Sequence, residues 1–407
     1  MNTDEYARFR DQAFRAMWEL AALEKRIEDE EQVPYELVMP ALRRMGAFGM
    51  LVPEAYGGAG LTISQYLPIL TELAKVHGAI RVIVHVHNSF AHALFELGTD
   101  RQRQAMLPGV ATGELSIAFA LTEPDHGTGM DTGTVARTDG TDFLVTGRKW
   151  LITNSDFASH FIVFAQTPDE GKGSLSAILV ERGTRGFTIE PVPETMGCKG
   201  GQHGLLTFAN ARVPRENLLG GAAGQGPEQL ERALEISRVF IAASSLGTAE
   251  YALELALRHA QTRVTFGRPI AERQAVQRYL AEMATDVHAL RHMLADAASA
   301  WDAGKRIPAQ SAMCKLFGLE AVGRVTDRAL LVAGGIGYTR ATPIERLYRD
   351  ARLNWLEEGP PTVQYMVAAR ELINGFWWDG ASRHQGQIAG ASDGVRSARR
   401  PRARVTG

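Results

Sequence analysis

Two apolar segments joined through a turn carry the polar residues best suited to cofactor chemistry. The first, 116–121, ends in a Thr-Glu-Pro corner at 122–124 and continues into a glycine-containing loop. The second follows the Asp-Gly pair at 139–140, which is typical of a β-hairpin, and ends in Trp-Leu-Ile-Thr at 150–153. Such strand ends can present backbone amides and hydroxyl groups to a planar, hydrogen-bonding cofactor without a helix. The alternative is that both segments simply form the core of a β module.

Two adjacent carboxylates, Glu357 and Glu358, come directly before Gly359 and between two predicted helices. A carboxylate in a dry pocket can remove a weakly acidic proton from carbon, because burial raises its pKa toward a useful value. Taken alone, the pair is better explained as solvated acids on the surface.

Several other chemistries are not indicated. The sequence contains no Gly-x-Gly-x-x-Gly after a strand, no Walker A motif, no His-Glu-x-x-His and no Gly-x-Ser-x-Gly. Cys198 and Cys314 are the only cysteines and have no second ligand at metal spacing, so neither a disulfide framework nor a zinc site is predicted. The glycine-rich stretch 220–226 is interpreted as a linker rather than a phosphate cradle.

The composition is that of an ordinary globular enzyme. The chain has 407 residues, of which 45% are hydrophobic and 22% charged, and its formal net charge is -2. This composition and charge do not indicate binding to nucleic acid or to a membrane surface. No apolar run approaches the roughly 20 residues of a membrane helix, and the charged N-terminus does not look like a signal sequence. We therefore predict a soluble, cytoplasmic protein.

Three regions position the candidate residues. Residues 1–112 show helical spacing of apolar side chains, whereas 113–222 hold short strands bounded by Gly, Pro or Asp, as in a small barrel or sandwich. Residues 223–378 return to helical patterns, and the basic tail 379–407 is predicted to be disordered. The fold class is therefore mainly α with a central β module. The long helical patterns cover 228–262, 270–303, 308–335 and 361–374.

The corner and hairpin at 119–154, with the segments 343–346 and 357–359, resemble the acyl-CoA dehydrogenase flavoprotein family over about residues 5–375. The resemblance implies FAD as the cofactor. It implies an N-terminal helical domain, a β-barrel and a C-terminal four-helix bundle. It also implies a homotetramer, a dimer of dimers, because cofactor sites in this family are built across subunits.

By the same resemblance, cofactor contacts fall on three segments. Arg263 and Phe266, at a turn between two long helices, would reach the FAD of a neighbouring subunit. An Arg fork suits a pyrophosphate, although a helix-end Arg also binds carbonyls or carboxylates. Gly334 and Gly335 would admit the pyrophosphate by close backbone approach. The isoalloxazine ring and ribityl chain would contact Phe119, Leu121, Thr122, Gly127, Thr128, Ile152 and Thr153.

Around the cofactor this chain departs from the family pattern. Leu151 stands where the family has Trp before Ile-Thr, and Trp150 is expected to face away because adjacent strand positions point to opposite faces. Leu331 replaces a Gln that would hydrogen-bond to the cofactor. Pro360 and Pro361 remove a hydroxyl group and two N–H donors beside the base. These changes leave room for an oxidase that returns electrons to oxygen.

The resemblance assigns the catalytic base to Glu358, which would take the α-proton of an acyl-CoA thioester while the β-hydride goes to flavin N5. The family's other base position precedes Arg238 and is Ser237 here, which cannot do this work. Arg238 and Gly359 are expected at the substrate. Arg81 aligns roughly with an Arg that holds the distal carboxylate in the glutaryl-CoA branch. If its side chain points inward, a dicarboxylic or aryl-substituted acyl group, such as glutaryl or benzylsuccinyl, becomes a candidate. The alternative for both Arg81 and Arg238 is an ordinary salt bridge within the protein.

The partners follow from the same resemblance. Electrons would pass to an electron-transferring flavoprotein. Besides the oxidase, two alternatives remain open. One is a dehydrogenase of an acyl-carrier-protein thioester. The other is a nucleic-acid-associated member with vestigial activity, indicated only by the arginines at 396–404. A short basic tail is more often solubilising, so nucleic acid is not expected as a partner.

Overall fold

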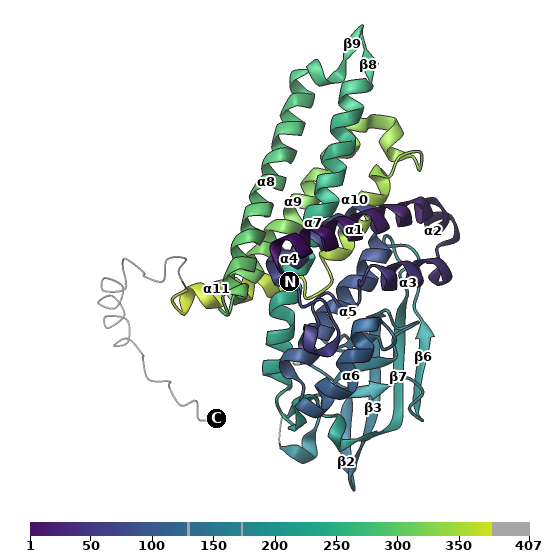
Figure 1. Cartoon of the computed structure of the whole chain (residues 1–407), viewed down its shortest axis with the longest axis vertical. Coiled ribbons are helices and arrows are strands. Elements are labelled where there is room, and N and C mark those ends of the chain that lie inside the picture. Colours follow the sequence, from purple (N-terminus) through teal and green to yellow (C-terminus); the bar gives the residue numbers. More distant parts are fainter. Residues whose placement is uncertain (128–130, 172–173, 377–407) are drawn as a thin grey trace, which may run out of the picture.

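The N-terminal part of the chain is helical. The computed structural model describes residues 1–127, 131–171 and 174–376 (Figure 1). Thr62 and Thr99 begin two of the helices with capping boxes, in which a threonine hydroxyl and a glutamine side chain satisfy the first free N–H groups. The helices are α1 (Thr3–Leu20), α2 (Glu24–Glu30), α3 (Tyr35–Arg44), α4 (Ile63–Val76), α5 (Gly78–Leu97) and α6 (Asp100–Thr112).

The β module is one curled, seven-stranded sheet. Its order is β1-β4-β2-β3-β7-β6, with β5 pairing on β4, and β1 and β2 pair with β4 in parallel. Within the described chain β5 and β6 do not pair with each other, so the expected barrel is an open sheet. The hairpin predicted at 139–140 is confirmed, because Asp139 pairs with Asp142 across the turn. The strands are β1 (Ile117–Ala120), β2 (Val135–Asp139), β3 (Asp142–Thr153), β4 (His160–Gln166), β5 (Leu175–Glu181), β6 (Phe187–Pro191) and β7 (His203–Pro214).

The C-terminal part is a bundle of long helices. Pro227 lies in the first turn of α7, where its missing N–H costs no helical hydrogen bond. α7 contacts α4 and α5, strand β5, and the helices α8 and α9, so it joins all three regions. The helices are α7 (Gly226–Thr262), α8 (Gln274–Asp302), α9 (Pro308–Ala333), α10 (Ile344–Asn354) and α11 (Pro361–Ile373), and the short strands β8 (Val264–Thr265) and β9 (Arg268–Pro269) form the tip of the α7–α8 hairpin (Figure 1).

The prediction of helices, then a β module, then helices is confirmed. The four long helical patterns correspond to α7, α8, α9 and α11, whereas α10 was not predicted as a helix. No helix in the described ranges is long and apolar enough to cross a membrane. The predicted disordered tail, with its arginines at 396–404, lies outside the described residues.

Candidate active site

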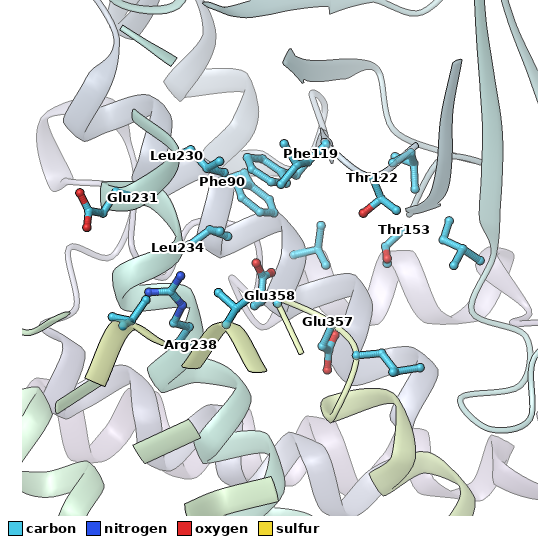
Figure 2. Close-up of a pocket in the computed structure, with 18 of the residues that line it drawn as sticks. Phe90, Phe119, Thr122, Thr153, Leu230, Glu231, Leu234, Arg238, Glu357 and Glu358 are labelled. Carbon is cyan, nitrogen blue, oxygen red and sulfur yellow. The ribbon is translucent and has the colours of Figure 1, made fainter. Parts of the chain in front are cut away.

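A cavity of about 680 Å³ lies where the sheet meets α5, α7 and α11 (Figure 2). One wall is formed by the ends of β1 and β3, and another by α7 and the segment between α10 and α11. The lining is mostly apolar, with a few charged and hydroxyl groups. The lining includes Phe90, Phe119, Leu121, Thr122, Leu151, Ile152, Thr153, Leu230, Glu231, Leu234, Arg238, Glu357, Glu358, Gly359 and Arg370.

Glu123 holds the corner after β1 in place. Its carboxylate, 6% exposed, accepts hydrogen bonds from Lys149 Nζ at 2.7 Å, Thr134 Oγ1 at 2.6 Å and the N–H of Gly133 at 2.7 Å. Burial works against the charged form of Glu123, but these hydrogen bonds outweigh it and lower its pKa. Burial lowers the pKa of Lys149 to about 8, although Glu123 opposes the change. The sequence analysis assigned no role to this buried pair, which fixes the strand ends that line the cavity.

A β-bulge brings three successive residues of β3 to the cavity. The register of β3 against β7 shifts between Lys149 and Ile152, and Leu151 has a left-handed backbone with φ 56°. Leu151, Ile152 and Thr153 all line the cavity, which simple alternation along a strand would not allow. Trp150 is not part of the lining, and the bulge rather than regular alternation decides this arrangement.

The strand-end wall suits a flavin. Thr122 and Thr153 offer hydroxyl and backbone groups to the polar edge of a planar ring, beside side chains that exclude water. The loop after the corner is tied by the N–H of Gly127, which donates to Asp131 Oδ2 at 2.8 Å. Thr128 lies outside the described residues. The apolar part of this wall consists of Phe119, Leu121, Leu151 and Ile152.

The residues predicted for the distal half of FAD do not line this cavity. Arg263 follows the last residue of α7, and Phe266 lies at the tip of the β8–β9 hairpin, 95% exposed (Figure 1). Gly334 and Gly335 begin the 3-10 helix η7 (Gly334–Tyr338), directly after α9. One chain therefore brings five of the predicted ring contacts to this cavity, which are Phe119, Leu121, Thr122, Ile152 and Thr153. Gly127 is not part of the lining, and neither are these four residues.

The segment 357–359, called the base loop below, is held through its three carbonyl oxygens. Lys315 on α9 donates to the first and third, the third at 2.5 Å. Gln364 on α11 donates to the second and third at 3.1 and 3.0 Å. The middle residue, Glu358, has a left-handed backbone with φ 55°. Its carboxyl group faces the cavity (Figure 2).

Opposing influences set the protonation of Glu358. Burial, followed by the charge of Glu357, raises its pKa to about 7, while the charge of Lys315, the nearby Ser237 hydroxyl group and the charge of Arg238 oppose that shift. A carboxyl group with such a pKa can act as a base near neutrality. Burial lowers the pKa of Lys315 to about 8. The sequence analysis missed Lys315, because no local signal marks a residue that reaches the loop from another helix.

The two arginines predicted at the substrate have different surroundings. Arg81, 3% exposed on α5, donates to the Glu357 carboxylate oxygens at 3.0 and 3.3 Å and to Asn354 Oδ1 at 3.0 Å. It is not part of the cavity lining, because its guanidinium turns to Glu357. Arg238 on α7 does line the cavity, and it is 5% exposed. Its Nε has no hydrogen-bond partner within the described chain.

Comparison with known proteins defines the class. Residues 3–114, 118–211 and 224–373 match the models of the N-terminal, middle and C-terminal domains of acyl-CoA dehydrogenase. The chain is 36% identical over 362 residues to an acyl-CoA dehydrogenase of Bacillus subtilis, covering 88% of this chain and 94% of that protein. It is 36% identical over 354 residues to the acryloyl-CoA reductase (NADH) of Anaerotignum propionicum, covering 84% and 89%. The structure of butyryl-CoA dehydrogenase from Megasphaera elsdenii superposes with a TM-score of 0.87 at 31% identity, covering 92% and 99%.

These matches span all three regions of the fold. The chain belongs to the acyl-CoA dehydrogenase family. It is an FAD-dependent oxidoreductase that acts on acyl-CoA thioesters. The predicted family, fold class and cofactor are therefore confirmed.

Proposed function

We propose that this protein catalyses the α,β-dehydrogenation of an acyl-CoA thioester with Glu358 as the base. The observation that carries the proposal is the Glu358 carboxyl group, which faces the cavity across from the strand ends and has its pKa raised to about 7 (Figure 2). An acyl group bound between these walls presents its α-carbon to Glu358, and the α-proton passes to a carboxylate oxygen. FAD, when bound, supplies the acceptor for the β-hydride.

The thioester carbonyl must be polarised as the proton leaves, because negative charge develops on its oxygen. The backbone N–H of Glu358 suits this task, since no hydrogen bond within the described residues occupies it. Lys315 and Gln364 fix the base loop through its carbonyl oxygens. The N–H and the carboxyl group of Glu358 thus belong to one rigid turn.

The test is anaerobic bleaching of the purified yellow enzyme by a panel of acyl-CoA thioesters. Glu358→Gln should slow bleaching by roughly 10²- to 10⁴-fold, the usual contribution of a general base. Glu231→Gln is the matched control, because Glu231 also lines the cavity but is paired with Arg370. A fully active Glu358→Gln enzyme would contradict the base. If no acyl-CoA bleaches the wild type, the two remaining alternatives are favoured: a dehydrogenase of an acyl-carrier-protein thioester, or a nucleic-acid-associated member of the family.

A carboxylated acyl group is the substrate class that Arg238 favours. A buried N–H donor without an acceptor is costly, and a distal carboxylate would supply an acceptor for the Nε of Arg238. Leu230 and Leu234 lie two turns and one turn before Arg238 on the same face of α7, so an acyl chain would follow an apolar wall to this charge. Arg81 is proposed instead to neutralise Glu357.

Two thioesters of matched shape test this substrate class. Glutaryl-CoA carries a distal carboxylate, and 5-methylhexanoyl-CoA carries an isopropyl group in its place. The wild type should bleach faster with glutaryl-CoA. Arg238→Met should lower the bleaching rate with glutaryl-CoA by at least about tenfold, which corresponds to the loss of a charged hydrogen bond, and should leave the rate with the neutral thioester unchanged. A wild type that prefers the neutral thioester would rule out a dicarboxylic substrate and leave aryl-substituted and plain acyl groups.

We also propose a homotetramer in which Arg263 and Phe266 of one copy approach the FAD of another. The proposal is supported by Phe266, an apolar ring that is 95% exposed at the end of a long hairpin. An electron-transferring flavoprotein is the proposed electron acceptor. Light scattering would test the tetramer, and peroxide formation without an acceptor protein would identify the oxidase alternative instead.

A further inference from the structure

Ser237 belongs to a buried polar chain beside the base, between α5 and α7. His85 Nε2 lies 3.3 Å from Ser237 Oγ, and His85 Nδ1 lies 3.4 Å from Arg81 Nη1. Ser89, one turn along α5 from His85, places its Oγ 3.3 Å from Ser237 Oγ. His85 and Ser237 are 0% exposed. Toward the cavity, Ser237 is close enough to Glu358 for its hydroxyl group to lower the pKa of the Glu358 carboxyl group.

Arg81 sets the direction of the hydrogen bonds in this chain. A guanidinium can only donate, so His85 Nδ1 must accept and the ring proton must sit on Nε2. Burial, together with the charges of Arg81 and Lys315, holds the pKa of His85 well below its usual range, so the ring stays neutral. His85 Nε2–H therefore donates to Ser237 Oγ, which leaves the Ser237 hydrogen for another acceptor.

In the structure that hydrogen is donated to Ser89 Oγ at 3.3 Å, and the Glu358 carboxyl group, whose pKa Ser237 lowers, is a second acceptor close by. An ionised carboxylate is the stronger acceptor, and its protonation removes most of that advantage. We propose that Ser237, held by His85, is a positioning residue for Glu358: its hydroxyl group binds the carboxylate before proton abstraction and turns to Ser89 afterwards. The proton gained by Glu358 comes from the substrate α-carbon, while the Ser237 hydrogen stays on its own oxygen. The inference rests on the proposed role of Glu358.

The other charged groups around Glu358 come from the base loop and three helices. Glu357 lies on the base loop and is paired with Arg81 of α5. Lys315 approaches from α9, and Arg238 lies on α7 next to Ser237. A change at Ser237 removes none of these charges. Because the pKa of Lys315 is about 8, the titration of Glu358 is best followed below that pH.

Single-turnover flavin reduction of the FAD-loaded enzyme, followed from about pH 5.5 to about pH 8, is the test. Ser237→Ala should move the midpoint of the rising limb upward by about one pH unit, because a donor to the ionised form is lost. Ser237→Thr keeps the hydroxyl group and should keep the midpoint. Ser244→Ala is the matched control, since Ser244 is also buried on α7 but donates to the Phe240 carbonyl at 3.0 Å.

Two changes at His85 separate its hydrogen bond from its volume. His85→Gln retains a donor near the position of Nε2 and should keep the midpoint. His85→Met fills the space without a donor and should move the midpoint upward, by less than Ser237→Ala. A purely structural role would lower the rate of these variants at every pH without moving the midpoint.

The outcomes distinguish this inference from the proposed function. If Glu358→Gln bleaches normally, the proposed base is wrong and the inference falls with it. If Glu358→Gln is inactive but Ser237→Ala keeps the wild-type midpoint, the base stands and the positioning role of Ser237 is overturned. A shift that appears in Ser237→Ala and equally in Ser244→Ala overturns it as well.

Discussion

Replacing Glu357 by Gln should lower the pKa of the neighbouring base. The charge of Glu357 is the second-largest cause, after burial, of the raised pKa of Glu358. Gln still offers an oxygen to Arg81, so the packing at this point is retained while the charge is lost. Like charges several ångströms apart interact by about 2 kcal/mol at an effective dielectric constant of about 20, which corresponds to a shift of about one to two pH units.

The direction follows from which form is active. Only ionised Glu358 can take a proton, so the wild-type rate should rise with pH through the pKa of about 7. In Glu357→Gln the rising part of the pH–rate curve should move to lower pH. The plateau rate should fall by less than tenfold for each unit by which the pKa of Glu358 falls, because a weaker base accepts protons less readily. The shift is opposite in sign to the one expected for Ser237→Ala.

Single-turnover flavin reduction across this pH range measures both quantities. Glu231→Gln is the matched control, because it makes the same chemical change at another carboxylate of the cavity lining. Its midpoint should remain that of the wild type. A Glu357→Gln midpoint that stays in place or rises would refute the electrostatic reasoning for this site.

Three further predictions concern stability, cofactor and assembly. Lys315→Met should lower the stability of the FAD-loaded enzyme by about 2–4 kcal/mol in urea unfolding, because two carbonyl oxygens of the base loop lose a charged donor; an unchanged midpoint would contradict this. Glu123→Gln should weaken FAD binding about tenfold in a fluorescence titration, since Lys149 loses its charged partner under the strand ends; equal affinity would show that the corner holds without the pair. Phe266→Ala should weaken the tetramer in light scattering and loosen FAD, while Val264→Ala, at another exposed position of the hairpin, should have a smaller effect.

The order of helices and strands could be predicted because their signals are local. Apolar spacing, the Asp-Gly pair at 139–140 and the proline at the start of α7 each act over a few residues. α10 was not predicted as a helix because it is short, with 11 residues, and rich in charged side chains. The domain limits at 112, 222 and 378 stay predictions.

The site was only partly predictable, because its electrostatics come from distant helices. Motif similarity singled out Glu358, but Lys315 reaches its loop from α9, and His85 contacts the nearby Ser237 from α5. The sequence placed Arg81 near the start of α5 without showing which carboxylate it would meet. In the structure that carboxylate is Glu357, so the arginine predicted for the substrate is held within the protein.

Backbone conformation is the other part that pattern reasoning cannot supply, and Leu151 offers a sharp test of it. In a regular strand, Val would be the best residue at this position and Gly the worst. At φ 56° a β-branched residue is strongly disfavoured, whereas Gly adopts the conformation freely. Leu151→Val should therefore destabilise the FAD-loaded enzyme by about 1–2 kcal/mol, and Leu151→Gly should be nearly neutral. The opposite ranking in thermal unfolding would mean a regular strand, in which Leu151, Ile152 and Thr153 could not all line the cavity.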